Sequence, residues 1–199
     1  SALTIQNSGA NAYNIAIGHN AGTAITTAVQ NTIIGGLAGD ALTSGNSNTA
    51  IGYAALSTED ETGGNTAIGW SSLVAQNAGS NAFNTAVGYS AGSAITTGLR
   101  NTITGGYAGD ALTSGSDAVL LGYQAGGAIT TGESNAIIGS FAGDALTIGN
   151  FNVAVGHKAL STSIDGDENV AIGYLALEDY EDADGHGFNV AVGSKSQRE

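Results

Sequence analysis

The sequence predicts an all-β chain that folds as a parallel β-solenoid (a β-roll or β-helix) of about 11 coils with a 17-residue period. The main reason is a recurring motif: an asparagine, a short run of small or β-branched residues, and a glycine. Examples are NTAIG at Asn48–Gly52 and NTAVG at Asn84–Gly88. The closing glycines lie 17 residues apart, except for one step of 19 and one of 20. A repeat this short cannot hold two helices, so each repeat is expected to form one coil.

The composition supports a solenoid rather than a conventional globular core. Proline, cysteine and methionine are absent, aromatic residues make up 6% of the chain, and 32 of its 199 residues are glycine. The apolar residues are mostly Ala, Val and Ile, and they do not form helical stripes. Without cysteine there is no disulfide and no thiolate metal site, and no residue pattern implies a cofactor.

The net charge of −13, with only four basic residues, argues against several classes of partner. Nucleic acid binding requires clustered Lys and Arg, and anionic membrane surfaces are disfavoured for the same reason. No apolar run approaches the ~20 residues that span a bilayer. We therefore expect neither nucleic acid binding nor membrane insertion.

The residues between the asparagine and the glycine of each motif predict a short strand. Side chains alternate along a strand, so Thr49 and Ile51 share one face while Ala50 lies on the other. Neither face has the polar character of a solvated strand, and both are expected to be buried. One face would line the coil interior, and the other would meet a second wall or a neighbouring protomer.

The asparagine recurs in ten of the eleven motifs and fails only at Ala118, beside Asp117. Stacked about 4.8 Å apart, these side chains are expected to bond to their neighbours above and below. The glycine would supply a positive φ or a close backbone approach. The asparagine ladder consists of Asn14, Asn31, Asn48, Asn65, Asn84, Asn101, Asn135, Asn152, Asn169 and Asn189. The glycine ladder consists of Gly18, Gly35, Gly52, Gly69, Gly88, Gly105, Gly122, Gly139, Gly156, Gly173 and Gly193.

The other half of each coil carries a second apolar segment, such as AITT at Ala24–Thr27 or AGDALT at Ala38–Thr43. These segments are expected to form a second short strand or a tight turn. Their order repeats in blocks of coils from end to end, so residues 1–199 form a single β-solenoid repeat domain. Eleven coils at about 4.8 Å each predict a rod roughly 50 Å long.

A stripe of planar side chains directly follows the ladder glycine in seven coils. Exposed rings along an edge suit stacking on glycan faces, whereas ring-on-ring packing would seal the corner or a subunit interface. Both interpretations remain open. In three of the other coils a large residue lies one place further on: Leu37, Tyr107 and Phe141. The stripe consists of His19, Tyr53, Trp70, Tyr89, Tyr123, His157 and Tyr174.

Acidic residues give only weak candidates for ligand binding. Asp40, Asp110 and Asp144 occupy one equivalent position, where a turn role is expected. A weak calcium candidate lies in the longest coil, beside His186; oxygen ligands at close spacing suit Ca²⁺, but their order does not fit the EF-hand pattern, and a solvated loop tip is the favoured interpretation. That set is Glu178, Asp179, Glu181, Asp182 and Asp184. The run from Glu59 to Glu61 is likewise expected to be a solvated loop tip.

Catalysis finds no support in the sequence. No catalytic Ser-His-Asp order, phosphate-binding glycine loop or paired-carboxylate cleft is present. We therefore expect a protein that is not an enzyme.

The motif resembles the repeats of two groups of proteins. One is the head of trimeric autotransporter adhesins, with repeats close to N-S-V-A-I-G. The other is the tail-fibre and appendage proteins of tailed phages, matched by NTAIGYAAL at Asn48–Leu56 and NTAVGYSAG at Asn84–Gly92. The resemblance implies a parallel β-roll, usually a homotrimer, that is extracellular, on a cell surface or on a virion. It brings no catalytic or binding residues, and the period of 17 is longer than that of the adhesin heads.

Three functions remain open from the sequence. The first is a structural fibre protein that attaches to surface or host glycans. The second is a ligand-free filament built head to tail, because SALTIQN at Ser1–Asn7 and the final GSKSQRE look like two halves of one coil; a segment cut from a longer fibre would have the same ends. The third is an ice-binding solenoid that uses the threonine pairs of AITT. In each of the first two the main partner is the protein itself.

Overall fold

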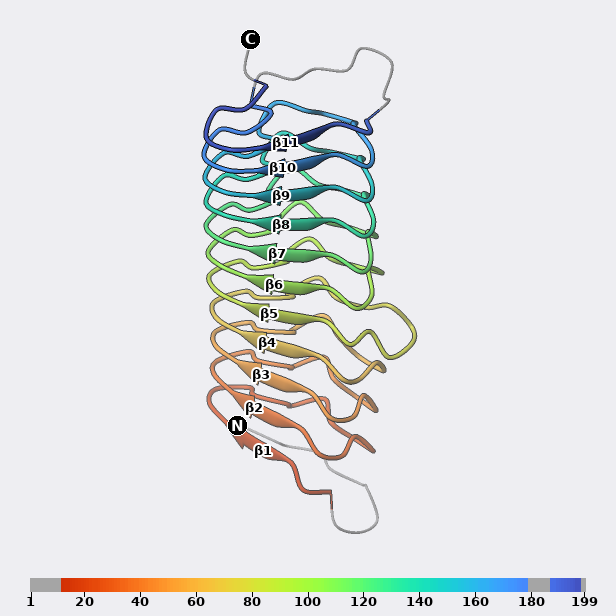
Figure 1. Ribbon diagram of the computed structural model, residues 1–199. Helices are drawn as coiled ribbons and strands as arrows, with labels where there is room; N and C mark the ends of the chain where they lie inside the picture. Colours follow the sequence, from red (N-terminus) through yellow and green to blue (C-terminus); the bar gives the residue numbers. More distant parts are fainter. Residues whose placement is uncertain (1–11, 179–186, 198–199) are drawn as a thin grey trace.

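The computed structural model describes residues 12–178 and 187–197, and it shows one rod of stacked coils (Figure 1). Each coil contributes one three-residue strand, and all eleven strands form a single parallel sheet in chain order. Equivalent residues pair directly, as in Thr49 with Thr66 and Ile51 with Ile68. This arrangement confirms the predicted β-solenoid. The strands are β1 (Ile15–Ile17), β2 (Thr32–Ile34), β3 (Thr49–Ile51), β4 (Thr66–Ile68), β5 (Thr85–Val87), β6 (Thr102–Thr104), β7 (Val119–Leu121), β8 (Ala136–Ile138), β9 (Val153–Val155), β10 (Val170–Ile172) and β11 (Val190–Val192).

The sheet forms only one wall of the rod. We number coils by their strands, so that coil n begins at the ladder glycine after βn. In the described residues the rest of each coil consists of turns and bends, so a second strand at AITT or AGDALT is not formed. Neighbouring coils are joined there by single main-chain hydrogen bonds, such as Gly39 N to Ala55 O at 2.9 Å. Threonine hydroxyls add to these bonds, as where Thr43 Oγ1 donates to Asp60 O at 2.9 Å and Thr113 Oγ1 to Thr130 O at 3.0 Å.

The two faces of the sheet differ in burial. The middle residue of each strand points into the rod, and from β2 to β11 it is buried, as Ile33, Ala50 and Leu120 are. The first and third residues point outward and are partly or largely exposed. The expectation that both faces are buried is therefore wrong within a single chain, because none of the described residues forms a second wall over the outer face.

Two positions of each coil share the task of filling the interior, so that a large apolar side chain at one accompanies a glycine or a polar residue at the other. Where the fourth residue after the ladder glycine is glycine, the seventh is Ile or Leu; in coils 3, 4 and 9 the fourth is leucine and the seventh is polar. A Cβ added at Gly126 would lie 2.8 Å from Ile129 Cδ1, which shows that the large side chain fills the space above the glycine. The first kind comprises Gly22 and Ile25, Gly39 and Leu42, Gly92 and Ile95, Gly109 and Leu112, Gly126 and Ile129, and Gly143 and Leu146; the second comprises Leu56 and Glu59, Leu73 and Gln76, and Leu160 and Ser163.

The asparagine ladder is present, but its bonds go mainly to the main chain. The Oδ1 of Asn84 accepts the backbone N–H of Asn101 at 2.8 Å, and the Oδ1 of Asn101 accepts that of Ala118 at 2.9 Å. The Nδ2 of Asn101 donates to the carbonyl of Gly115, 14 residues later, at 2.9 Å. Each buried amide thus accepts a hydrogen bond from a backbone N–H of the next coil and donates one to a backbone carbonyl 14 residues later. Both main-chain groups lie in or next to turns and would otherwise lack a partner.

The glycine ladder has the role expected of it. Gly52 adopts φ +135°, and a Cβ there would lie 2.3 Å from the carbonyl oxygen of Gly69 in the next coil. Any side chain would collide with backbone that is itself fixed by the sheet. The residue must therefore be glycine for conformational and for steric reasons.

Ala118 interrupts the asparagine ladder and offers a test of its energetics. It is fully buried, and it gives the amide of Asn135 no side-chain acceptor. Ala118→Asn restores one bond to Asn135 and one across the coil, so we expect a gain of about 1–2 kcal/mol in the free energy of unfolding. Asn101→Ala removes the equivalent bonds and should cost about 1–3 kcal/mol. Chemical denaturation measures both changes, and a destabilising Ala118→Asn would contradict the assigned role.

Candidate functional site

One ring per coil forms a continuous column along the corner that follows the sheet. Neighbouring ring centroids lie between 4.8 and 6.2 Å apart, from coil 3 to coil 10. We call this column the ring ladder. It consists of Tyr53, Trp70, Tyr89, Tyr107, Tyr123, Phe141, His157 and Tyr174.

The ring ladder differs from the predicted stripe at two places. Tyr107 and Phe141 lie one position later in their coils, yet they contact the rings on both sides. His19 belongs to coil 1 and is separated from Tyr53 by a coil that carries no ring. The one-place shift was visible in the sequence, but only the stacking shows that the shifted rings complete the column.

The orientation of the rings changes along the ladder. Trp70 lies 13° from parallel with Tyr53 and 7° from parallel with Tyr89, so these rings face one another and present their edges to solvent. They are 45–50% exposed. Sugar stacking needs an open ring face, and ring-on-ring packing therefore accounts for this part of the ladder. Around Phe141 the rings instead meet at 74°.

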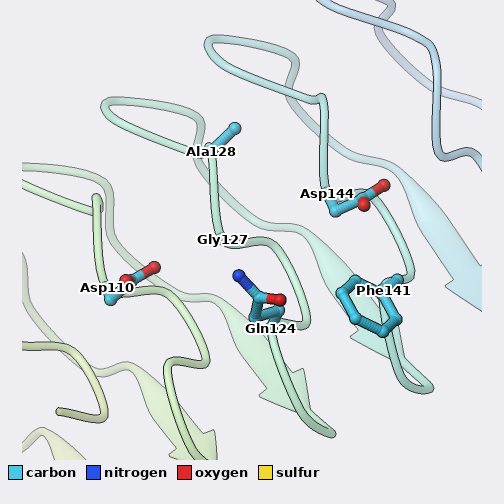
Figure 2. Close-up of a pocket in the computed structure, with 6 residues that line it drawn as sticks. All are labelled: Asp110, Gln124, Gly127, Ala128, Phe141 and Asp144. Atoms are coloured by element: carbon cyan, nitrogen blue, oxygen red, sulfur yellow. The ribbon is translucent and has the colours of Figure 1, made fainter.

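A shallow cavity of about 390 Å³ lies beside this second part of the ladder (Figure 2). We call it the notch. Gly127 in coil 7 occupies the position held by Asp110 in coil 6 and Asp144 in coil 8, and its missing side chain opens the space between them. Figure 2 shows the two carboxyl groups on either side of Gly127, with the Gln124 amide and the Phe141 ring at the rim. The lining residues are Asp110, Gln124, Gly127, Ala128, Phe141 and Asp144.

The aspartates of the notch are partly buried, and burial raises the pKa of both Asp110 and Asp144. Asp40 lies at the same position in coil 2 and has its pKa raised for the same reason. In all three residues a hydrogen bond from the residue's own main chain opposes that rise, in keeping with the expected turn role. The Oδ1 atom of Asp144 is enclosed and has no hydrogen-bond partner. Asp110 and Asp144 therefore contribute carboxyl groups to the lining of the notch.

A second group of polar residues, which includes Glu59 and Gln76, lies inside the rod. Glu59 is fully buried, so its assignment to a solvated loop tip is wrong; Glu61 is exposed as expected. Glu59 Oε1 accepts the backbone N–H of Thr62 at 2.9 Å, and Oε2 lies 3.5 Å from Asn65 Nδ2. Burial raises the pKa of Glu59, with a smaller contribution from the charge of Asp60. Glu59 is the seventh residue after the ladder glycine of its coil, and the side chain at this position points into the rod.

Metal binding gains no support in the part of the chain that the structure describes. Residues 12–178 and 187–197 contain no group of three or more His, Cys, Asp or Glu side chains placed to hold an ion. Of the calcium candidate only Glu178 lies in these ranges; Asp179, Glu181, Asp182 and Asp184 lie outside the described residues. Among the same residues no helix is long and apolar enough to cross a membrane.

Comparison of the chain with protein-family models, with curated proteins and with solved structures gave no match. The features of the chain that bear on function are its fold, the outward face of the sheet, the ring ladder and the notch.

The buried Glu59 gives a test based on pH. Its raised folded-state pKa means that wild-type stability falls as pH rises from below the unfolded value, near 4.5, through the folded value. Glu59→Gln removes this titration, so the stability of the wild type relative to the variant should decrease between pH 4 and pH 7. Glu61→Gln removes a charge from an exposed site of the same loop and serves as the control. A constant difference for Glu59→Gln across this range would contradict the burial of a titrating carboxyl group.

Proposed function

We propose that the chain is a rigid structural segment of an extracellular or virion fibre, and that its outward sheet face packs against further copies of the protein. The observation that carries this proposal is the chemistry of that face. Both outward positions of all eleven strands hold only Thr, Ile, Val, Leu or Ala, although the whole chain has 17 acidic residues. An extended, uncharged and exposed surface on an acidic protein is typical of an interface.

The size of the face suits association. Eleven strands about 4.8 Å apart and two outward columns of side chains give an area on the order of 600 Å². The ring ladder runs along one border of this area. A standard interface buries roughly 800 Å² on each partner. A second copy provides a surface that is equally flat, uncharged and long, with the same spacing along the rod.

The ladders provide the stiffness that a fibre needs. Main-chain bonds, asparagine amides, threonine hydroxyls and stacked rings each join every coil to the next over most of the rod. Bending the rod would strain all of these columns together. The resemblance of the repeats to phage tail-fibre and adhesin repeats supports the fibre role, and it makes attachment to surface glycans part of the proposal.

Ice binding and head-to-tail filament formation are the two alternative functions. In AITT the first threonine uses its hydroxyl within the rod: Thr26 Oγ1 donates to Thr43 O at 3.1 Å, and Thr130 Oγ1 to Thr147 O at 3.1 Å. These hydroxyls are not free to order ice, which speaks against that function. Head-to-tail stacking into filaments remains an alternative form of self-assembly, and electron microscopy of a concentration series distinguishes it from lateral packing.

A charge placed on the outward face should prevent lateral association. Ile138 in β8 is 37% exposed and has strands on both sides of it in the sheet, so Ile138→Glu would bury an unpaired carboxylate in the interface. We expect multi-angle light scattering to show multimers of the wild type and at least about tenfold weaker association of the variant, equivalent to about 1.4 kcal/mol. Ser114→Glu adds the same charge at an exposed corner and should leave association unchanged. A wild type that stays monomeric at every concentration would refute self-association.

A further inference from the structure

We propose that the notch binds an uncharged sugar ring of a glycan. This inference rests on the attachment role included in the proposed function, and it assigns that role to a place other than the stacked rings. The site lies on coils 6 to 8, beside the ring ladder and off the outward sheet face. Lateral packing of copies would therefore leave it open.

At the centre of the notch one position carries no side chain. Equivalent positions in other coils hold Ser57, Ser93 and Ser161, whereas coil 7 holds Gly127. No steric need explains this glycine: a Cβ there would meet nothing closer than 3.4 Å, and its φ lies outside the left-handed range. The resulting volume of about 390 Å³ falls within the roughly 300–1,000 Å³ of small-molecule sites.

The polar groups of the notch call for a ligand that donates hydrogen bonds on two sides. Ionised Asp110 and Asp144 only accept, and the Gln124 amide both accepts and donates. The two aspartates are two coils apart, or about 10 Å. One cation cannot bind both, since Ca²⁺–oxygen distances are about 2.3–2.6 Å. A ring with hydroxyls at opposite edges spans such a gap.

Two further features narrow the ligand class. The Phe141 ring lies at 74° to both neighbouring rings, unlike the parallel Trp70, and it provides an apolar surface at the rim of the notch. The apolar C–H face of a sugar suits such a ring. Two carboxylates on a chain of net charge −13 repel anions, so sialic acids and uronic acids are disfavoured.

The test is saturation-transfer NMR on the full chain with methyl glycosides of galactose, glucose, mannose, N-acetylglucosamine and N-acetylgalactosamine, and with sialic acid as the anionic comparator. We expect at least one neutral glycoside to bind and sialic acid not to bind. Gly127→Ser fills the notch with the side chain that other coils carry, and it should weaken binding by at least tenfold without lowering the unfolding temperature. The matched control Ser57→Gly makes the reverse change four coils away and should bind like the wild type.

Three outcomes would refute the notch as the glycan site. They also distinguish a failure of the notch from a failure of the proposed fibre function. Binding that survives Gly127→Ser but is lost in Trp70→Ala would place the sugar on the stacked rings, so that the notch is wrong and glycan attachment stands. A wild type that binds none of the neutral glycosides would refute the notch, and with it this form of attachment. Preference for sialic acid would contradict the charge argument. None of these results affects self-association, which light scattering tests separately.

Discussion

The in-register stacking of equivalent residues is the constraint on which the rest of the structure depends. Each main-chain position lies one strand spacing above its counterpart, so any side chain repeated at the period meets its own kind. Amides then bond to the next backbone, rings contact rings, and glycines allow carbonyl groups to approach. The same constraint prevents substitution at the ladder positions, because a Cβ at Gly52 would enter the backbone of the next coil.

The interior shows how such a rod tolerates variation between repeats. Its cross-section is fixed by the coils above and below, so the enclosed volume must be conserved within each coil. Gly126 with Ile129 and Leu56 with Glu59 are two solutions to the same packing problem. In the second solution leucine supplies the apolar bulk, which lets a polar residue lie inside. Buried Glu59 and Gln76 then bond to the asparagine ladder, to Asn65 and Asn84 respectively.

The surfaces divide the proposed functions between them. The outward sheet face is flat, uncharged and repetitive, which suits contact with other copies of the same rod. The ring ladder stiffens the corner beside it through contacts that use much of the ring surface. The notch interrupts the repeated surface at one coil. A site that is not repeated can bind a ligand that the other coils do not bind.

The sequence alone determined the fold class, the positions of the strands and both ladders, because each depends on a residue type that recurs with the 17-residue period. It could not decide which face of the strand points inward, since Ala50 and Ile51 are both apolar; the closed coil places the middle residue inside, whether it is small, as Ala50 is, or large, as Ile137 is. It could not show that Glu59 is buried or that Tyr107 and Phe141 complete the ring ladder, because these depend on the path of the chain around the corners. There Tyr107 and Phe141 adopt φ +57°, held by backbone bonds to the preceding coil such as Tyr107 N to Tyr89 O at 2.8 Å. The notch was invisible for the same reason: Gly127 acquires meaning only between Asp110 and Asp144, which lie 17 residues away in the sequence and one coil away in space.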